Sequence, residues 1–341
     1  MSGPDTFETK AQLLAEHRKG ANGRDFLRRL GDVVAGPLQR NTEDVELLLA
    51  HAQAAWIADQ RDPAATRARE SAQRLITLVP DLADGYRLLG LAHLSRREYR
   101  DAFLALSAVK TIASPVNLDN FRALARLLMT DVPKVSFEWG GQRYAFDLTT
   151  HNAAAIESSA FHSIGMLTEA EELQFLGTIL DPTRIKRVVE VGVLLGNHSA
   201  YFLKTLRPEA LTLIDADPAN LPFIEHTVSY NSAPARPAVT IHNAFVGAGG
   251  GEVTFAGAKV PMQPLADLVQ GPVDFLKVDV DGGEESLLKG AAPVIEASRP
   301  VVMIETTPAS HAAVEAWFAA RRYAVTRVFD HGGYRNVVLA P

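Results

Sequence analysis

Two apolar segments joined by a glycine-containing turn constrain the fold of this chain most strongly. Residues 188–191 (VVEV) are followed by Gly192 and Gly196, and residues 213–215 (LID) then end in Asp215. An apolar run, a turn with glycines, an amphipathic run and a second apolar run ending in a carboxylate are typical of strand, turn, helix and strand. The pattern predicts a nucleoside-binding βαβ unit, in which glycines permit close backbone approach and the carboxylate accepts ribose hydroxyls.

The glycine spacing favours S-adenosylmethionine over a dinucleotide as the cofactor. Dinucleotide-binding turns follow G-x-G-x-x-G and pack a pyrophosphate against a helix N-terminus, whereas Gly192 and Gly196 follow Glu190 with no third glycine. A carboxylate at Glu190 would repel a pyrophosphate but suits the ammonium group of a methionine moiety. We therefore expect Glu190, Gly192, Gly196 and Asp215 to contact S-adenosylmethionine; the alternative is close helix–strand packing without a ligand.

A second constellation follows in residues 273–284 (VDFLKVDVDGGE). Lys277, Asp279 and Asp281 alternate along the expected strand and so share one side near its C-terminal end. Ligands bind at that end of an open parallel sheet, and a lysine inside an otherwise apolar run needs a partner. These three residues are candidate catalytic residues, with Asp279 also expected beside the cofactor. The alternative is a solvated strand end before a Gly-Gly turn.

Five segments between residues 150 and 341 resemble the FkbM family of S-adenosylmethionine-dependent methyltransferases. They are VVEVGVLLGNHSAYF (188–202), LIDADPANLPFIEHTVSYN (213–231), IHNAFVGAGGGEVTF (241–255), DFLKVDVDGGEESLLKGA (274–291) and VVMIE (301–305). The fourth is the most specific, because it looks like the family's K-I-D-V-E-G-x-E block with Asp281 in place of its Glu. The chain departs from the family at Leu194, where an Asn is usual, and at Ala216, where a Pro is usual. The resemblance implies methyl transfer to a hydroxyl of a sugar or secondary metabolite.

The second half of the chain predicts an α/β fold with a Rossmann-like class I methyltransferase sheet. Short apolar runs at 239–242, 275–280 and 301–305 alternate with helical segments, as in a parallel sheet. Residues 323–329 and 334–339 flank a turn at 330–333 and predict a terminal hairpin, which makes one strand antiparallel to its neighbours.

The first 130 residues predict a separate all-α domain. Apolar residues recur at helical spacing in 45–58, 64–78 and 82–94. The tetratricopeptide-repeat pattern is approached by Tyr86, Leu89, Gly90, Ala102 and Pro115, and by Ala68 and Pro80 of a degenerate preceding unit. The alternative is an unrelated antiparallel helical bundle. A short array of this kind would rest on a neighbour, so we expect it to bind a protein partner or to self-associate.

Residues 131–149 are predicted to link the domains, which we place at 1–130 (tetratricopeptide-repeat-like) and 150–341 (methyltransferase). Pro133 stops a helix, and residues 135–139 and 142–148 alternate around Gly140-Gly141, which predicts a β-hairpin. Residues 153–180 then predict one or two helices, with residues 168–171 (TEAE) as a cap and first turn.

Composition excludes several classes of function. A formal net charge of −6 and a pI near 5.9 argue against a nucleic-acid or anionic-membrane binder. Zero cysteines exclude disulfides, thiolate zinc sites and cysteine nucleophiles. No 18 apolar residues run together, and the N-terminus lacks a signal-peptide pattern, so a cytoplasmic protein is expected.

Catalytic roles follow from methyl transfer being an in-line displacement, which needs aligned reactants and, for a hydroxyl, a proton acceptor. Asp279 is the first candidate, flanked by Lys277 and Asp281, and Glu305 is a further carboxylate at a strand end. Asn243 is expected either to bind adenine N6 or to cap the segment that follows it. His198 and His331 could each reach the site, although solvated or capping roles are the simpler interpretation.

A Mg²⁺-assisted route through Asp279 and Asp281 is the less favoured alternative, because the spacing supplies no third ligand. An O-methyltransferase acting on a sugar or secondary metabolite is the first functional hypothesis. A cofactor-binding scaffold that uses its helical repeats to bind a protein is the second. An NAD-linked oxidoreductase is a third, and the missing third glycine counts against it.

Overall fold

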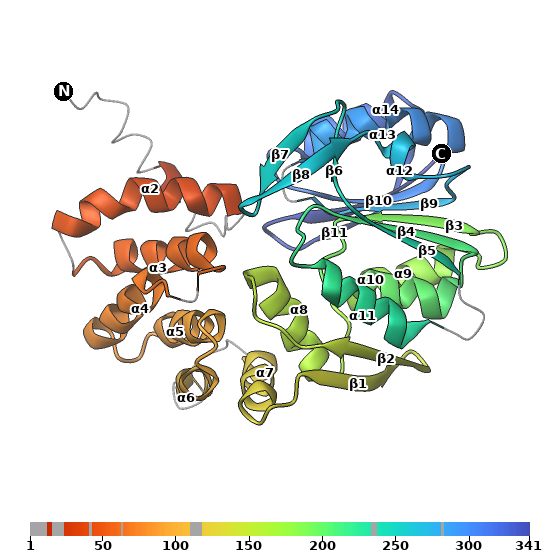
Figure 1. Cartoon of the computed structure of the whole chain (residues 1–341). Coiled ribbons are helices and arrows are strands. Elements are labelled where there is room, and N and C mark those ends of the chain that lie inside the picture. The colour runs from red at the N-terminus through yellow and green to blue at the C-terminus, as the bar shows by residue number, and fades with distance from the viewer. Residues whose placement is uncertain are drawn as a thin grey trace, which may run out of the picture. The chain divides into compact units, whose positions relative to one another are not determined.

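The chain forms two compact units in the computed structural model (Figure 1), which describes residues 12–15, 24–40, 43–62, 64–109, 118–232, 237–280 and 283–341. The first unit comprises the chain up to Val135 together with Leu148–Met166, and the second comprises Ser136–Asp147 and Leu167–Pro341. The units are therefore divided differently from the predicted domains, because the segment that follows the hairpin packs with the N-terminal helices. No helix among these residues is long and apolar enough to cross a membrane.

The first unit is a succession of helices, as predicted. They are α2 (Arg24–Arg40), α3 (Val45–Asp59), α4 (Arg67–Leu78), α5 (Ala83–Ser95), α6 (Tyr99–Ala108), α7 (Asp119–Met129) and α8 (Ala153–Ser163). Each packs against the next along the chain. Gly90 permits the close approach of α5 and α6, since a Cβ there would lie 2.5 Å from Leu106 Cγ. Pro115 lies outside the described residues, and the repeat assignment stays a prediction.

The second unit contains a seven-stranded sheet of the expected class. Its strands are β3 (Arg187–Val191), β4 (Ala210–Asp215), β5 (Ala238–Asn243), β9 (Phe275–Val278), β10 (Val301–Thr306), β11 (Ala324–Asp330) and β12 (Arg335–Ala340). Their order is β11-β12-β10-β9-β3-β4-β5. Neighbours from β10 to β5 pair in parallel, and β12 is antiparallel to both β10 and β11. The predicted α/β fold with a terminal antiparallel hairpin is confirmed.

Helices cover both faces of this sheet (Figure 1). They are α9 (Ala170–Ile179), α10 (Asn197–Tyr201) with the π-helical segment η2 (Phe202–Leu206), α11 (Leu221–Asn231), α12 (Leu265–Leu268), α13 (Glu284–Ser298) and α14 (His311–Ala319). Alternation along the strands divides the core. Phe275 and Met303 belong to one apolar cluster, whereas Leu276 and Val302 belong to another on the opposite face. A strand buried on both faces explains the nearly continuous apolar runs in the sequence.

Two smaller β-structures complete the described fold. The predicted hairpin is formed by β1 (Lys134–Trp139) and β2 (Gln142–Asp147), and Asn231 of α11 bonds the β2 backbone through both the N–H and the carbonyl of Ala145. A three-stranded sheet, not predicted, lies in sequence between β5 and β9. It comprises β6 (Phe245–Val246), β7 (Glu252–Phe255) and β8 (Ala258–Gln263), in the order β6-β8-β7.

Candidate functional site

The candidate site lies within the second unit, at the C-terminal edge of the parallel strands. β3, β4, β9 and β10 run in the same direction, so the residues that end them meet at one edge. These residues are Gly192 after β3, Asp215 at the end of β4, Asp279 after β9 and Glu305 near the end of β10. The four positions singled out in the sequence therefore share one edge of the sheet.

The two loop glycines are required by the backbone. Gly192 has φ +81°, and a Cβ there would lie 1.6 Å from the carbonyl oxygen of Asp279. Gly196 has φ +78°, and its Cβ would lie 2.9 Å from Thr227 Cγ2. Both conformations are left-handed, which favours glycine. The loop after β3 is consequently in direct contact with the end of β9, so the predicted cofactor loop and the predicted catalytic strand meet.

Asp215 accepts four hydrogen bonds, two from this loop and two from residues that follow β4. Its Oδ2 accepts from the backbone N–H groups of Val193 (3.0 Å) and Leu194 (2.8 Å). Its Oδ1 accepts from the backbone N–H of Asp217 (2.8 Å) and from Asn220 Nδ2 (3.1 Å). Burial raises the pKa of this carboxyl, against the effect of the four donors. Asp215 therefore shapes the loop itself, and its predicted contact with ribose hydroxyls stays a prediction.

Asn243 ties the end of β5 to the end of β4. Its Nδ2 donates to the carbonyl oxygen of Asp215 at 2.9 Å, and the N–H of Ala244 donates to the same oxygen at 3.2 Å. The side chain thus links the ends of β4 and β5, and its two expected roles, binding adenine N6 or capping the segment that follows, stay predictions. Because Nδ2 is already bonded, only Oδ1 of the side-chain amide would be left to accept a hydrogen bond from adenine N6.

Glu190 is a fully buried carboxyl with one unsatisfied oxygen. Ser199 Oγ donates to Oε2 at 2.6 Å, whereas Oε1 has no hydrogen-bond partner among the described residues. Burial raises the pKa of Glu190, while the charges of Lys277 and His198 act to lower it. A buried acceptor without a partner costs free energy, so this atom is suited to receive a donor from a bound ligand or a water.

The lysine predicted to need a partner finds it two residues away. Lys277 is 2% exposed, and its Nζ donates to Asp279 Oδ2 at 2.7 Å. Burial opposes the charged form of Lys277, but the carboxylates of Asp279, Glu190 and Glu169 outweigh it and raise the pKa of the ammonium. Lys277 is therefore a buried, permanently charged ammonium that interacts with these carboxylates. The Asp279 side chain is 32% exposed and remains within reach of a ligand.

The other predicted carboxylates have different outcomes. Glu305 is buried near the end of β10, beside β9 and β12. Asp281 lies outside the described residues, so its predicted catalytic role stays a prediction.

Glu169, the residue before α9, was missed by the sequence analysis as a site residue. Its Oε1 accepts from Asn336 Nδ2 (2.8 Å) and from the Tyr334 hydroxyl (3.4 Å), and its Oε2 lies 3.1 Å from His198 Nε2. Burial acts to raise the pKa of Glu169, but His198, Lys277 and Asn336 outweigh it and lower it to about 2. Glu169 stands at the N-cap position of α9 with a left-handed φ of 54° and makes no side-chain capping bond, and the helix begins at Ala170, within the predicted first turn.

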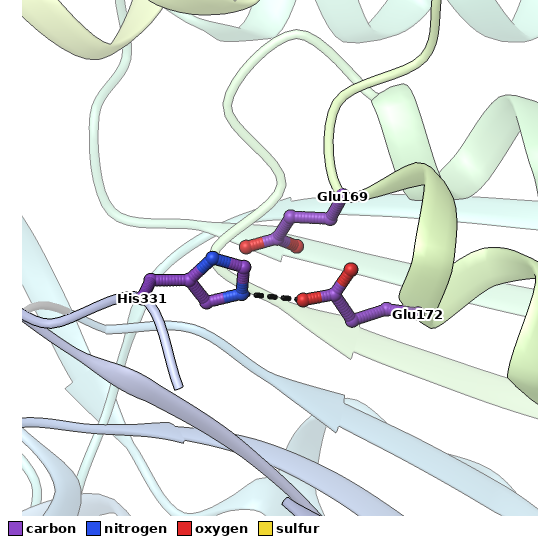
Figure 2. A group of neighbouring side chains, drawn as sticks. All are labelled: Glu169, Glu172 and His331. Atoms are coloured by element: carbon purple, nitrogen blue, oxygen red, sulfur yellow. Dashed lines mark hydrogen bonds and ion pairs between the residues drawn. The ribbon is translucent and has the colours of Figure 1, made fainter. Parts of the chain in front are cut away.

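A second carboxylate of this helix bonds a histidine from the terminal hairpin. Figure 2 shows Glu169, Glu172 and His331. One carboxylate oxygen of each glutamate and one imidazole nitrogen of the histidine lie within 4.8 Å of one another. Nε2 of His331 lies 2.5 Å from Glu172 Oε1, and the Tyr334 ring stacks on the imidazole at 4.6 Å and 19°. Glu172 and His331 bond each other and Glu169 has three partners, so we describe the group as a hydrogen-bond network.

Comparison with known proteins gives a family match for part of the chain. Residues 210–325 match the family model described as the methyltransferase FkbM domain. No curated protein matches the chain. Among solved structures, methyltransferase FkbM from Methylobacillus flagellatus KT is similar, with 17% identity over 75% of this chain and 65% of that one, at a TM-score of 0.43. The chain is also similar to M. jannaschii TYW2 in complex with AdoMet, with 13% identity over 61% of this chain and 85% of that one, at a TM-score of 0.37. It is similar to M. capricolum TrmK in complex with S-adenosyl-homocysteine, with 8% identity over 50% of this chain and 66% of that one, at a TM-score of 0.35.

The match to the Methylobacillus flagellatus protein covers less than two thirds of that protein. The three TM-scores are all below 0.5. The matched residues include β4, β9 and β10, with Asp215, Lys277, Asp279 and Glu305 at or near their ends. Residues 210–325, about a third of the chain, are therefore similar to the methyltransferase FkbM domain.

Proposed function

We propose that this protein transfers a methyl group from S-adenosylmethionine to a hydroxyl of a sugar or secondary metabolite. The observation that carries the proposal is the contact between the two predicted motifs. Gly192 of the cofactor loop packs so closely on the carbonyl of Asp279 that no side chain fits between them. A cofactor bound over this loop would present its reacting end to the Lys277–Asp279 pair, which is the alignment that methyl transfer requires.

The residues around the loop fit the parts of this cofactor. The unsatisfied Oε1 of Glu190 is a buried acceptor for the amino group, directly or through a water. Gly192 and Gly196 keep the loop free of side chains, and Asp215 both shapes the loop and offers acceptors to the ribose. With Nδ2 of Asn243 engaged by the β4 backbone, its Oδ1 is the atom to accept from adenine N6. The cofactor, when bound, supplies the electrophilic methyl group.

The acceptor side of the site is acidic, which favours a hydroxylated substrate over a phosphorylated one. Burial and the negative charges of Glu169, Glu305, Asp279 and Glu172 raise the pKa of the Tyr334 phenol. Lys277 is the buried cation among them. Ionised carboxylates accept hydrogen bonds from hydroxyls but repel anions. We assign Asp279, Lys277, Asp281 and Glu305 to positioning the acceptor hydroxyl, with Asp279 nearest the methyl group.

Two measurements on the full chain test this function. Calorimetry is expected to show S-adenosylmethionine or S-adenosylhomocysteine binding in the micromolar range, about −8 kcal/mol. Transfer of a tritiated methyl group from the cofactor is then measured with methyl α-D-glucopyranoside and a panel of polyols and phenols. Cofactor binding without transfer to any acceptor would favour the scaffold hypothesis, and NADH binding in its place would favour an oxidoreductase.

Metal dependence is tested in the same assay. Activity that EDTA abolishes and Mg²⁺ restores would move the proposal to the metal-assisted route, in which a cation lowers the pKa of the bound hydroxyl. We expect activity to be insensitive to EDTA, because Oδ2 of Asp279 is already bonded to an ammonium group at 2.7 Å.

The helical unit is proposed to bind a protein partner or a second copy of the chain. Its helices pack in sequence order, as a repeat array does, and Leu104 of α6 leaves 57% of its surface exposed. Light scattering of the full chain measures self-association, and Leu104→Glu is expected to weaken it. A chain that is monomeric at all concentrations would leave only the hetero-partner version of this proposal.

A further inference from the structure

We propose that Glu172 and His331 form the proton-accepting pair of the methyl transfer, with Nδ1 of His331 as the atom that receives the proton. This inference rests on the proposed function, since it assigns a residue to the same reaction. Glu172 belongs to α9 and His331 to the turn between β11 and β12, so the pair joins elements that are distant in the sequence.

The hydrogen bond between the two side chains determines which ring nitrogen is free. Glu172 is 2% exposed, and an ionised carboxylate only accepts hydrogen bonds. Nε2 of His331, 2.5 Å from Oε1, therefore carries the proton of the neutral ring. Nδ1 is then an acceptor, and the histidine side chain is 33% exposed. A buried carboxylate that fixes a histidine tautomer in this way is the arrangement that prepares an imidazole for proton transfer.

Tyr334 holds this ring beside the rest of the site. Its own ring stacks on the imidazole with centroids 4.6 Å apart, which restricts rotation of His331. Its hydroxyl donates to Glu169 at 3.4 Å, and the charges of Asp279 and Glu305 act on the same phenol. Tyr334 thus contacts both His331 and Glu169, and the charge of Glu169 also acts on Lys277, the partner of Asp279. The acceptor hydroxyl would bind beside this network.

The other described titratable groups of the site are less suited to receiving a proton. The pKa of Glu169 is lowered to about 2, so this carboxylate gains a proton only in strong acid. Glu190 is 0% exposed and lies beneath the loop. Asp279 shares one oxygen with the Lys277 ammonium, which suits it to orienting the hydroxyl. His331 is the group that combines a free acceptor atom, exposure and a buried anionic partner.

The step balances in atoms and charge. The acceptor oxygen forms a bond to the methyl carbon as the carbon–sulfur bond breaks, and the electron pair of that bond returns to sulfur, which becomes a neutral thioether. The hydroxyl proton passes to Nδ1 of His331. The positive charge lost from the sulfonium thus appears on the imidazolium, where the buried carboxylate of Glu172 stabilises it through a charge-assisted hydrogen bond.

The tautomer can be measured without turnover. Two-bond ¹⁵N–¹H spectra of the full chain, labelled at histidine and saturated with S-adenosylhomocysteine, are compared for wild type and His331→Gln, which identifies the signals of this ring. We expect a proton on Nε2 and none on Nδ1 at high pH, and we expect Glu172→Gln to abolish the preference. A proton on Nδ1 in the wild type would overturn the proposal.

Kinetics test the role in the reaction. With methyl α-D-glucopyranoside and the polyol panel as acceptors, His331→Gln is expected to lower kcat by about 10²- to 10⁴-fold with little change in cofactor affinity. Added imidazole is expected to restore part of the activity of His331→Ala, which a purely structural role would not allow. The matched control is His226→Gln, a histidine that bonds a carboxylate, Asp147, at 2.5 Å on the β1–β2 hairpin side of α11.

The failures of the two proposals are distinguishable. Wild-type protein that transfers no methyl group to any acceptor contradicts the proposed function. Wild-type turnover in His331→Gln contradicts the proton-accepting pair alone. Tight Mn²⁺ binding that is lost in both His331→Gln and Glu172→Gln, together with activity abolished by EDTA, would replace the pair with a metal site at these residues.

Discussion

The candidate site has two halves that are built differently. We call the loop after β3 with Asp215 the proposed cofactor half, and the side chains around Lys277, Asp279 and Glu169 the proposed acceptor half. On the cofactor half, Asp215 organises one short stretch of chain, and most of its bonds are to backbone N–H groups of the loop after β3 and of the residues that follow β4. On the acceptor half, side chains from α9, β9, β10 and the β11–β12 hairpin meet one another. A site made of backbone is tolerant of sequence, whereas a site made of side chains is set by individual residues. The cofactor half therefore suits a shared reagent and the acceptor half a particular substrate.

If the halves are separable, variants of the acceptor half should change kcat and variants of the cofactor half should change binding. Asp279→Asn is expected to have the largest effect. It keeps the size of the side chain but removes the anion paired with Lys277 at 2.7 Å, so turnover should fall by about 10²- to 10⁴-fold. Calorimetry should show cofactor affinity nearly unchanged. A loss confined to affinity would mean that Asp279 belongs to the cofactor half.

Gly192→Ala tests the contact between the halves. The added Cβ would lie 1.6 Å from the Asp279 carbonyl, at a φ of +81°, so the free energy of unfolding should fall by roughly 2 to 5 kcal/mol. Cofactor binding should be lost as well. Gly249→Ala is the matched control, because nothing lies within 4 Å of its Cβ position and its φ is not left-handed. Equal stability of the two variants in urea unfolding would contradict the close contact.

Glu169→Gln tests the network of the acceptor half through pH. The folded pKa of about 2 lies below the ordinary value of 4.5 for a glutamate carboxyl, so the ionised carboxylate stabilises the fold above pH 4.5. That stabilisation is lost as the pH falls toward 2. At neutral pH the variant should be less stable than wild type by up to about 3 kcal/mol, and the difference should close between pH 4.5 and 2. Glu285→Gln, which removes an exposed partner of Lys289, should leave the stability close to that of the wild type at every pH.

Asp215→Ala tests the cofactor half. Four hydrogen bonds would be lost, two to the loop after β3 and two to residues that follow β4, and cofactor binding should weaken by about 1 to 3 kcal/mol. Because the acceptor residues stay in place, kcat at saturating cofactor should change little. An unchanged affinity would remove Asp215 from the cofactor site, and a fall in kcat at saturation would show that the halves are not separable.

The same contrast explains what the sequence could predict. The βαβ unit of the proposed cofactor half was predictable because its parts are adjacent in the sequence: the glycine turn, the strand and Asp215 have a spacing that follows from backbone geometry. The contacts of these residues with a cofactor stay predictions. The order and direction of the strands followed from alternating apolar runs and the terminal hairpin. On the acceptor half, Lys277 and Asp279 stood out in the sequence because a lysine in an apolar run is unusual, and Glu305 stood out as a carboxylate at a strand end.

The rest of the acceptor half depends on tertiary contacts. Glu169 and Glu172 were indistinguishable from the acidic first turn of an ordinary helix, and Asn336 from a polar residue of a terminal strand. Only folding brings Asn336 to Glu169, at 2.8 Å. The one local signal available was the histidine in a Gly-Gly turn, His331, which the sequence could place near the site without naming its partner. The small β6–β8–β7 sheet was missed because its strands are short and because the segment between β6 and β7 is rich in glycine.

Leu194→Asn is the subtlest test of the cofactor half. Leu194 has φ +55°, a left-handed conformation that costs a leucine about 1 kcal/mol and that asparagine adopts more readily. Its side chain is not needed for the bond from its N–H to Asp215, so the variant should gain about 0.5 to 1 kcal/mol of stability with cofactor affinity unchanged. Ala256→Gly relieves a similar φ of +53° in the β7–β8 turn and should give a comparable gain. If Leu194→Asn instead weakens cofactor binding while Ala256→Gly does not, the leucine side chain itself contacts the cofactor, and this half of the site is less purely backbone than its hydrogen bonds indicate.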